Sequence, residues 1–214
     1  MRPITVSVGP LAAASANNIA LSQTPAGAGA LTLNGSLVVK GVAVLDTPRR
    51  VLITTADTTH TFTITGTTPT GALLTESFLV AGGATYSQLD YATVTSITIS
   101  GAATGAVTVG TNGIASTPWV RLDEWANTQV SIQCDVTGTV NYTVQSTLDD
   151  PNSATNPVLP SAVDWIATND TNAVNATASL QTNYQFSPTF ARVLLNSGTG
   201  SVTAIFTQAN VANR

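Results

Sequence analysis

Alternation of apolar and hydroxyl side chains along short runs is the feature that most constrains how this chain can fold. In Thr61–Gly66, Phe62 and Ile64 alternate with threonine, and Val94–Ser100 has the same spacing. Successive side chains of an extended strand point to opposite faces, so this spacing places the large apolar groups toward a core and threonine toward solvent. The only stretch that could hold a short helix, residues 162–176, is rich in Asn and Thr. We therefore predict an all-β protein with an antiparallel β-sandwich architecture.

Turn residues divide the alternating runs into two groups. Thr-Gly pairs at 104–105, 137–138 and 199–200 each stand directly before a strand candidate, and we expect each pair to turn a β-hairpin. Their recurrence fits a duplicated sandwich, and it fits equally well the similarity of turns in any threonine-rich β protein. The chain is long enough for two domains near the usual size of ~100 residues. We predict two small β-sandwich modules, over residues 31–113 and 114–214.

The first thirty residues differ from the rest of the chain. They contain one short strand candidate, Ile4–Val8, followed by small residues that end in Thr24–Ala30. Such a segment has too few large apolar groups to pack alone. We expect residues 1–30 to form an extended N-terminal arm that is not cleaved and that lies against a partner or another part of the subunit.

Charge is scarce in this sequence and limits the classes of partner. Charged residues make up 8% of the chain, against roughly 25% in an average soluble protein. An uncharged, threonine-rich surface costs less to desolvate than a Lys or Glu surface, so it suits contact with other proteins. The net charge is -4 and the arginines are scattered apart from one pair, which argues against direct binding of nucleic acid. No apolar run approaches the ~20 residues of a membrane-spanning helix, so we expect no membrane partner.

Few residues of this sequence could take part in catalysis or metal binding. The single histidine, His60, lies beside a strand candidate and has no nucleophile motif near it. A Ser-His-Asp arrangement stays open because such triads assemble from distant positions, but an ordinary residue at a hairpin end is the favoured interpretation. Cys134 is the only cysteine, which excludes an intrachain disulfide and a Cys-based zinc site and fits synthesis in a reducing cytosol.

Paired charges offer two further hypotheses. Asp123-Glu124 and Asp149-Asp150, the latter with Asn152 nearby, supply oxygen ligands that calcium could use, but neither pair has EF-hand spacing. For Asp149-Asp150 we favour capping of the turn before Pro151 by hydrogen bonds to the backbone. Arg49-Arg50 is expected to be an exposed pair at the start of a strand, with an interface ion pair as the alternative.

Aromatic residues gather in the second half of the chain. Trp119, Trp125 and Trp165 could form a carbohydrate-stacking platform, but we favour an aromatic core, because large rings supply much of the burial in a small β domain. The remaining rings of interest in this half are Tyr142, Tyr184, Phe186 and Phe190. We therefore expect no catalytic, cofactor-binding or metal-binding residues and no cofactor.

Several segments share a threonine-rich style with regular turns. They are Pro48–Val51, Phe62–Gly66, Val94–Val109, Trp119–Leu122, Leu148–Pro151, Phe190–Val193 and Thr199–Val202. In style and composition these segments resemble the small structural proteins of tailed bacteriophage particles, and the resemblance covers most of residues 31–208.

The resemblance implies a non-enzymatic β-sandwich component of the virion that assembles in repeated copies. On that basis we expect a capsid decoration or cement protein that binds and stabilises the major capsid shell through its N-terminal arm. Its partners would be other copies of itself and virion proteins such as the major capsid protein, and it would be assembled into the virion in the host cytoplasm. The alternatives are a neck, tail or fibre component of the virion, and a carbohydrate-binding, adhesin-like module.

Overall fold

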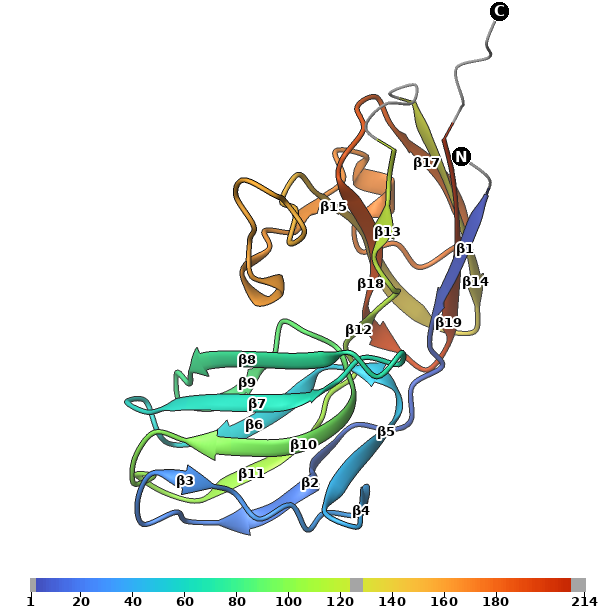
Figure 1. Cartoon of the computed structure of the whole chain (residues 1–214). Coiled ribbons are helices and arrows are strands. Elements are labelled where there is room, and N and C mark those ends of the chain that lie inside the picture. The colour runs from blue at the N-terminus through green and yellow to red at the C-terminus, as the bar shows by residue number, and fades with distance from the viewer. Residues whose placement is uncertain (1–2, 124–128, 209–214) are drawn as a thin grey trace, which may run out of the picture. The chain divides into compact units, whose positions relative to one another are not determined.

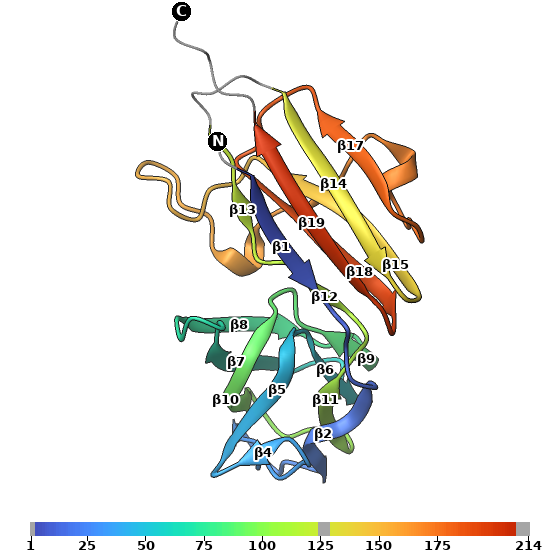
Figure 2. The same cartoon turned by 90° about the vertical axis from the view of Figure 1, so that its right-hand side faces the viewer.

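The computed structural model describes residues 3–123 and 129–208 and is all-β, as predicted (Figures 1 and 2). Residues 12–113 form one compact unit, here called the middle unit. Residues 1–11 and 114–214 form the other, here called the terminal unit. The helical elements of the described residues are the short 3-10 turns Pro160–Ala162 and Thr171–Ala173. Over the same residues, the chain forms no helix with the length and apolar character needed to cross a membrane.

The middle unit consists of two antiparallel sheets. Sheet C has the strand order β4 (Val38–Val39), β5 (Val42–Arg49), β10 (Tyr91–Ile99), β7 (Thr61–Thr67) and β8 (Leu73–Leu79), with β3 (Gly29–Ala30) also paired to β10. Sheet B has the order β2 (Ser15–Gln23), β11 (Val107–Thr111), β6 (Val51–Thr55) and β9 (Gly83–Tyr86).

The core of the middle unit follows the alternation of its strands. Phe62 and Ile64 on β7 are fully buried, and the threonines between them are half-exposed. On β10, Ile97 pairs with Ile64, so both strands bury the same face. Val51 and Ile53 on β6 are buried in the same way. The period of two therefore identified the apolar face of each of these strands correctly.

The terminal unit also consists of two antiparallel sheets. Sheet A has the order β1 (Ile4–Val8), β19 (Ser201–Gln208), β14 (Val130–Thr137) and β17 (Leu180–Tyr184). Sheet D has the order β12 (Ala115–Ser116), β18 (Phe190–Gly198), β15 (Val140–Thr147) and β16 (Ile166–Ala167), with β13 (Val120–Arg121) also paired to β18. Residues of both sheets contribute to one buried apolar cluster, in which Tyr142, Ile132, Leu195 and Phe206 are the largest fully buried members.

The N-terminal segment differs from the extended arm that we expected over residues 1–30. Strand β1 pairs with β19 from Ile4 opposite Phe206 to Val8 opposite Val202, and β2 pairs with β11. Residues 4–8 thus belong to a sheet of the terminal unit, and residues 15–23 to a sheet of the middle unit. The reason is that Ile4, Val6 and Val8 pack against the terminal core while their backbone pairs with β19, an arrangement that depends on a strand about 200 residues away.

The three Thr-Gly turns also differ from expectation. None of them joins two paired strands of a hairpin. Strand β14 belongs to sheet A and β15 to sheet D, while β18 belongs to sheet D and β19 to sheet A. The turn after β10 likewise leads from sheet C to β11 of sheet B. Each turn therefore carries the chain across the sandwich, and the same turn chemistry serves a hairpin or a crossing because the pairing partners lie elsewhere in the sequence.

Two of these crossings touch each other in the terminal unit. Gly200 donates a backbone hydrogen bond to the carbonyl oxygen of Thr139 at 2.9 Å. A Cβ atom on Gly200 would overlap the carbonyl oxygen of Thr137 and lie 2.9 Å from the carbonyl carbon of Gly138. The backbones of the two turns thus pack directly on one another, which only glycine permits at position 200.

Replacing Gly200 with alanine should therefore destabilise the terminal unit. We expect Gly200→Ala to lower the free energy of unfolding by about 1–3 kcal/mol, the range for overpacking. Denaturant unfolding monitored by tryptophan fluorescence measures this change. Gly27→Ala is the control, because a Cβ there meets no atom within 4 Å. Equal stability of the two variants would show that the turns do not depend on this close contact.

Candidate functional site

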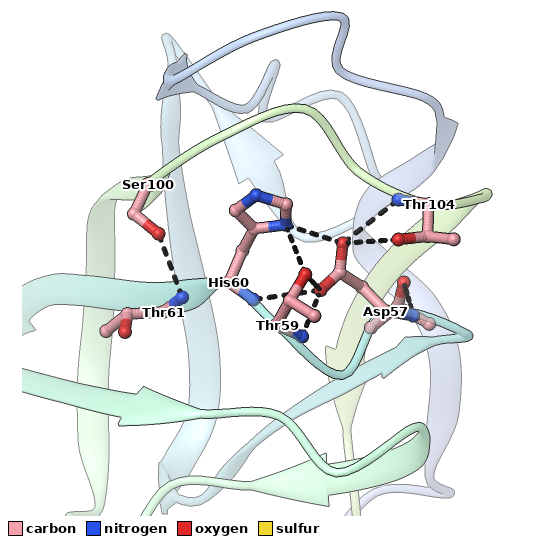
Figure 3. A network of polar contacts seen from close by, with 7 residues as sticks. Asp57, Thr59, His60, Thr61, Ser100 and Thr104 are labelled. Atoms are coloured by element: carbon pink, nitrogen blue, oxygen red, sulfur yellow. Dashed lines mark hydrogen bonds and ion pairs between the residues drawn. The ribbon is translucent and has the colours of Figure 1, made fainter.

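Asp57 is the centre of a polar network that includes His60 (Figure 3). Its carboxylate is fully buried in the loop between β6 and β7. One oxygen, Oδ1, accepts hydrogen bonds from the backbone N–H groups of Thr59 at 2.8 Å and His60 at 2.9 Å. The other oxygen, Oδ2, lies 2.8 Å from His60 Nδ1 and accepts a hydrogen bond from the backbone N–H of Thr104 at 2.9 Å. The carboxylate therefore joins the β6–β7 loop to the β10–β11 loop.

The contacts of this network hold the β6–β7 loop against the β10–β11 loop. The hydrogen bond from His60 and those from backbone N–H groups hold the pKa of Asp57 far below its usual value, despite burial. The His60 ring lies directly over Gly101, where a Cβ would overlap it. Ser100, at the start of the β10–β11 loop, accepts a hydrogen bond from the Thr61 backbone at 3.0 Å (Figure 3). Sequence reasoning did not single out Asp57, although its spacing of three residues from the only histidine was a usable signal.

The low pKa of Asp57 makes a prediction about acid stability. A carboxyl group whose pKa is lowered by folding contributes stability above its unfolded pKa of ~3.9 and loses that contribution as the pH falls toward its folded pKa. We expect the middle unit to lose stability progressively below about pH 4. Asp57→Asn should be less stable at pH 7 and should show a weaker dependence on pH, because it has no proton to take up. Urea unfolding between pH 2.5 and 7 measures both, and parallel curves for the two proteins would contradict the assignment.

The acidic pairs do not gather into a cation site in the described structure. Asp150 forms a two-point ion pair with Arg121, with N···O distances of 2.9 and 3.2 Å, and caps the turn at the backbone N–H of Asn152. Asp149 instead accepts a hydrogen bond from the backbone N–H of Asp164 at 2.8 Å. Glu124 lies outside the described residues. Among those described, no three His, Cys, Asp or Glu side chains cluster as ligands of a metal ion.

The prediction for Arg49 and Arg50 was wrong, because both side chains are buried. Arg49 forms an ion pair with Asp46 at 3.0 Å and donates hydrogen bonds to the carbonyl oxygens of Ala12 and Asn112. These hydrogen bonds connect strand β5 to the first and last segments of the chain within the middle unit. Arg50 lies over the ring of Tyr86 at 5.8 Å. A buried arginine requires acceptors from distant segments, which a local sequence pattern does not reveal.

The tryptophans described by the structure pack on one another. The ring of Trp119 meets that of Trp165 edge-on with centroids 5.0 Å apart, and it meets Phe190 at 6.0 Å. The guanidinium of Arg192 lies 4.1 Å from the centre of the Trp165 ring, which covers one face of that ring. Trp125 lies outside the described residues. This arrangement anchors the long loop between β15 and β16 onto sheet D, and it favours packing over a sugar-stacking platform.

Cys134 has no environment for nucleophilic chemistry. Its side chain is fully buried on β14, and burial raises the pKa of the thiol to about 11. A thiol with such a pKa stays protonated near neutral pH, and the thiolate is the reactive form. Cys134 therefore acts as a small apolar residue of the terminal core.

The outward face of sheet C is the most distinctive surface in the described structure. Strands β10, β7 and β8 run side by side (Figure 1), and their outward side chains are almost all hydroxyls. Rows of these residues cross the sheet: Thr98, Thr63 and Ser77 form one row, and Ser96, Thr65 and Thr75 form the next. None of the described side chains on this face of the three strands is charged.

Many of the hydroxyls on this face already have partners within the sheet. Thr63 Oγ1 lies 2.7 Å from Ser77 Oγ, and Thr67 Oγ1 lies 2.8 Å from Thr93 Oγ1. Cross-strand hydroxyl pairs of this kind satisfy polar groups without water. Covering the face with another protein would therefore cost little desolvation.

Exposed apolar side chains lie at both sides of the same face. On β8, Leu73 and Leu79 point outward, and Leu73 has 72% of its surface exposed. On the opposite side, Val44 lies next to Thr93, and Val39 on β4 has 62% of its surface exposed. We call this surface, from β4 to β8, the sheet C face. Sequence analysis noted the threonines but missed the face, because the register that aligns them comes from strand pairing.

Comparisons of the chain with models of protein families, with curated proteins and with solved structures found no match.

Proposed function

We propose that this chain is a structural, non-enzymatic protein of a tailed-bacteriophage virion, and that it decorates and stabilises the capsid shell. The observation that carries the proposal is the sheet C face, which combines paired hydroxyls, exposed Leu and Val side chains and an absence of charge among the described outward side chains of β10, β7 and β8. The resemblance of the sequence to small virion proteins supplies the class of assembly. The docking surface is thus a sheet face rather than the N-terminal arm, because β1 is already paired within its own unit.

The physical chemistry of this face suits a permanent contact. Apolar side chains such as Leu73 and Leu79 gain roughly 25 cal/mol for each Å² that they remove from water. The threonine rows between them are flat and β-branched, so they lose little side-chain entropy on contact. An interface made in this way needs no long charged side chains to become ordered.

The number of copies in a particle separates the shell from other positions in the virion. Quantitative mass spectrometry of purified particles should find copies on the order of hundreds if the protein covers a capsid, and about six or twelve if it belongs to a neck or tail. Absence of the protein from purified particles would contradict both positions.

A charge placed on the sheet C face should block docking. Thr65 lies in the middle of this face, between Thr75 and Ser96. Burying an unpaired ammonium there would be unfavourable, so we expect Thr65→Lys to weaken binding to particles that lack the protein by tenfold or more, which is about 1.4 kcal/mol. Bound copies per particle measure the effect after incubation with purified protein.

The control is Thr54→Lys, which places the same charge on the outward face of sheet B in the same unit. Thr54 has the same half-buried environment, between buried Ile53 and Thr55. We expect this variant to bind as the unmodified protein does. If both variants bind equally well, the sheet C face is not the docking surface.

A further inference from the structure

The terminal unit has a pocket at the open side of its sandwich, where β16 is the last strand of sheet D and β17 the last strand of sheet A. Its volume is about 500 Å³, within the range of roughly 300–1,000 Å³ that is typical of small-molecule sites. The end of β15, the segment from Ile166 to Asp170 and the segment from Asn183 to Phe186 line it. The pocket belongs to one unit, so the arrangement of the two units does not affect it.

The buried wall of this pocket carries a hydroxyl whose contacts with neighbouring hydroxyls are poorly aligned. Tyr184 is only 4% exposed, and its hydroxyl meets the geometry of a hydrogen bond with no group in the described residues. The hydroxyl side chains of Ser146 and Thr168, which are also buried, line the pocket beside it. Ser146 and Thr168 interact with the Tyr184 hydroxyl without ideal geometry. Hydrogen bonds weaken when they are poorly aligned, so a ligand that supplied a well-aligned partner would gain free energy.

The rim of the pocket is apolar and exposed. Leu148 and Ile166 have 71% and 67% of their surfaces exposed, and Phe186, which also lines the pocket, has 44% exposed. The ring of Phe186 packs against that of Tyr184 with centroids 5.4 Å apart, which fixes its orientation. A ligand that enters thus meets a hydroxyl-lined wall and an apolar, partly aromatic mouth.

The charge of the lining argues against an anionic ligand. The described residues of the lining include no Lys, Arg or His side chain to attract an anion. Its one carboxylate, Asp170, already accepts hydrogen bonds from the backbone and side-chain N–H groups of Asn172 through Oδ1. Other polar residues of the lining are Asn169 and Gln185, whose amide groups both donate and accept.

We propose that this pocket binds a neutral sugar ring, with its hydroxyl edge toward Tyr184, Ser146 and Thr168 and its C–H face against Phe186. A sugar presents hydroxyls that donate and accept on its edge and apolar C–H groups on its faces, which matches the two kinds of lining. Burial raises the pKa of Tyr184 to about 12, so its hydroxyl stays protonated and can donate to a sugar oxygen. The proposal places carbohydrate binding at this pocket rather than at Trp119 and Trp165, and it stands independently of any role in a capsid.

Saturation-transfer NMR of the whole protein with methyl glycosides of glucose, galactose, mannose and N-acetylglucosamine tests the proposal. We expect at least one of them to bind with a dissociation constant of about 1 mM, the affinity of a single weakly held ring. Tyr184→Phe removes only the hydroxyl and should weaken that binding by fivefold or more. Phe186→Ala should abolish it within the measured range.

A matched pair of glutamines provides the control. Gln185 lines the pocket, whereas Gln181 on β17 lies on the outward face of sheet A, away from the pocket. Gln185→Ala should weaken binding, and Gln181→Ala should leave it within twofold of the unmodified protein. Circular dichroism of each variant establishes that the fold is retained.

Three results would overturn the proposal. The first is the absence of saturation transfer to all four glycosides at about 20 mM with folded protein, a concentration at which a ~1 mM ligand is nearly saturating. The second is binding that Tyr184→Phe and Phe186→Ala leave unchanged, which would place the sugar elsewhere. The third concerns phenol, which is tested in parallel. If phenol binds, Tyr184→Phe weakens that binding and no sugar binds, the pocket would be assigned to aromatic alcohols.

Discussion

Each sheet of this protein has one apolar face, and covering that face with a second sheet is the constraint on which the remaining structure depends. Sheets B and C cover each other's buried residues in the middle unit, and sheets A and D do so in the terminal unit. Because consecutive strands such as β14 and β15 belong to opposite sheets, short turns must carry the chain across the core. The close contact of the turns at Gly138 and Gly200 follows from two such crossings at one end of the sandwich.

Several of the charged side chains that the structure describes are used inside the protein. Asp57 clamps two loops, Arg49 holds carbonyl groups from both ends of the middle unit, and buried Glu76 accepts hydrogen bonds from the backbone of Gln88 and Leu89. In the terminal unit, Arg192 lies against Trp165. Charges in these positions secure loops that have little apolar surface of their own. Consequently the outward sheet faces are covered mainly by hydroxyl and amide groups.

The two surfaces proposed for binding differ in the way in which they would hold a partner. The sheet C face is broad and flat, and its hydroxyls are paired within the sheet, so its contacts would come from shape and from exposed side chains such as Leu73. The pocket between β16 and β17 is small and is lined by the hydroxyls of Tyr184, Ser146 and Thr168, so it would select a ligand by hydrogen bonding. The two surfaces belong to different units, so a substitution in the sheet C face does not alter a residue of the pocket, and the reverse also holds.

The sequence by itself determined the all-β class and the buried face of strands such as β7, because side-chain alternation is a local property of extended backbone. It also showed that threonine would dominate the surface. Only the tertiary structure decided that Ile4–Val8 pairs with β19, that Arg49 is buried, and that the Thr-Gly turns cross between sheets. The rows of the sheet C face and the pocket at Tyr184 likewise required it. Each of these features joins segments far apart in the chain, and pairing between distant segments leaves no mark in either segment alone.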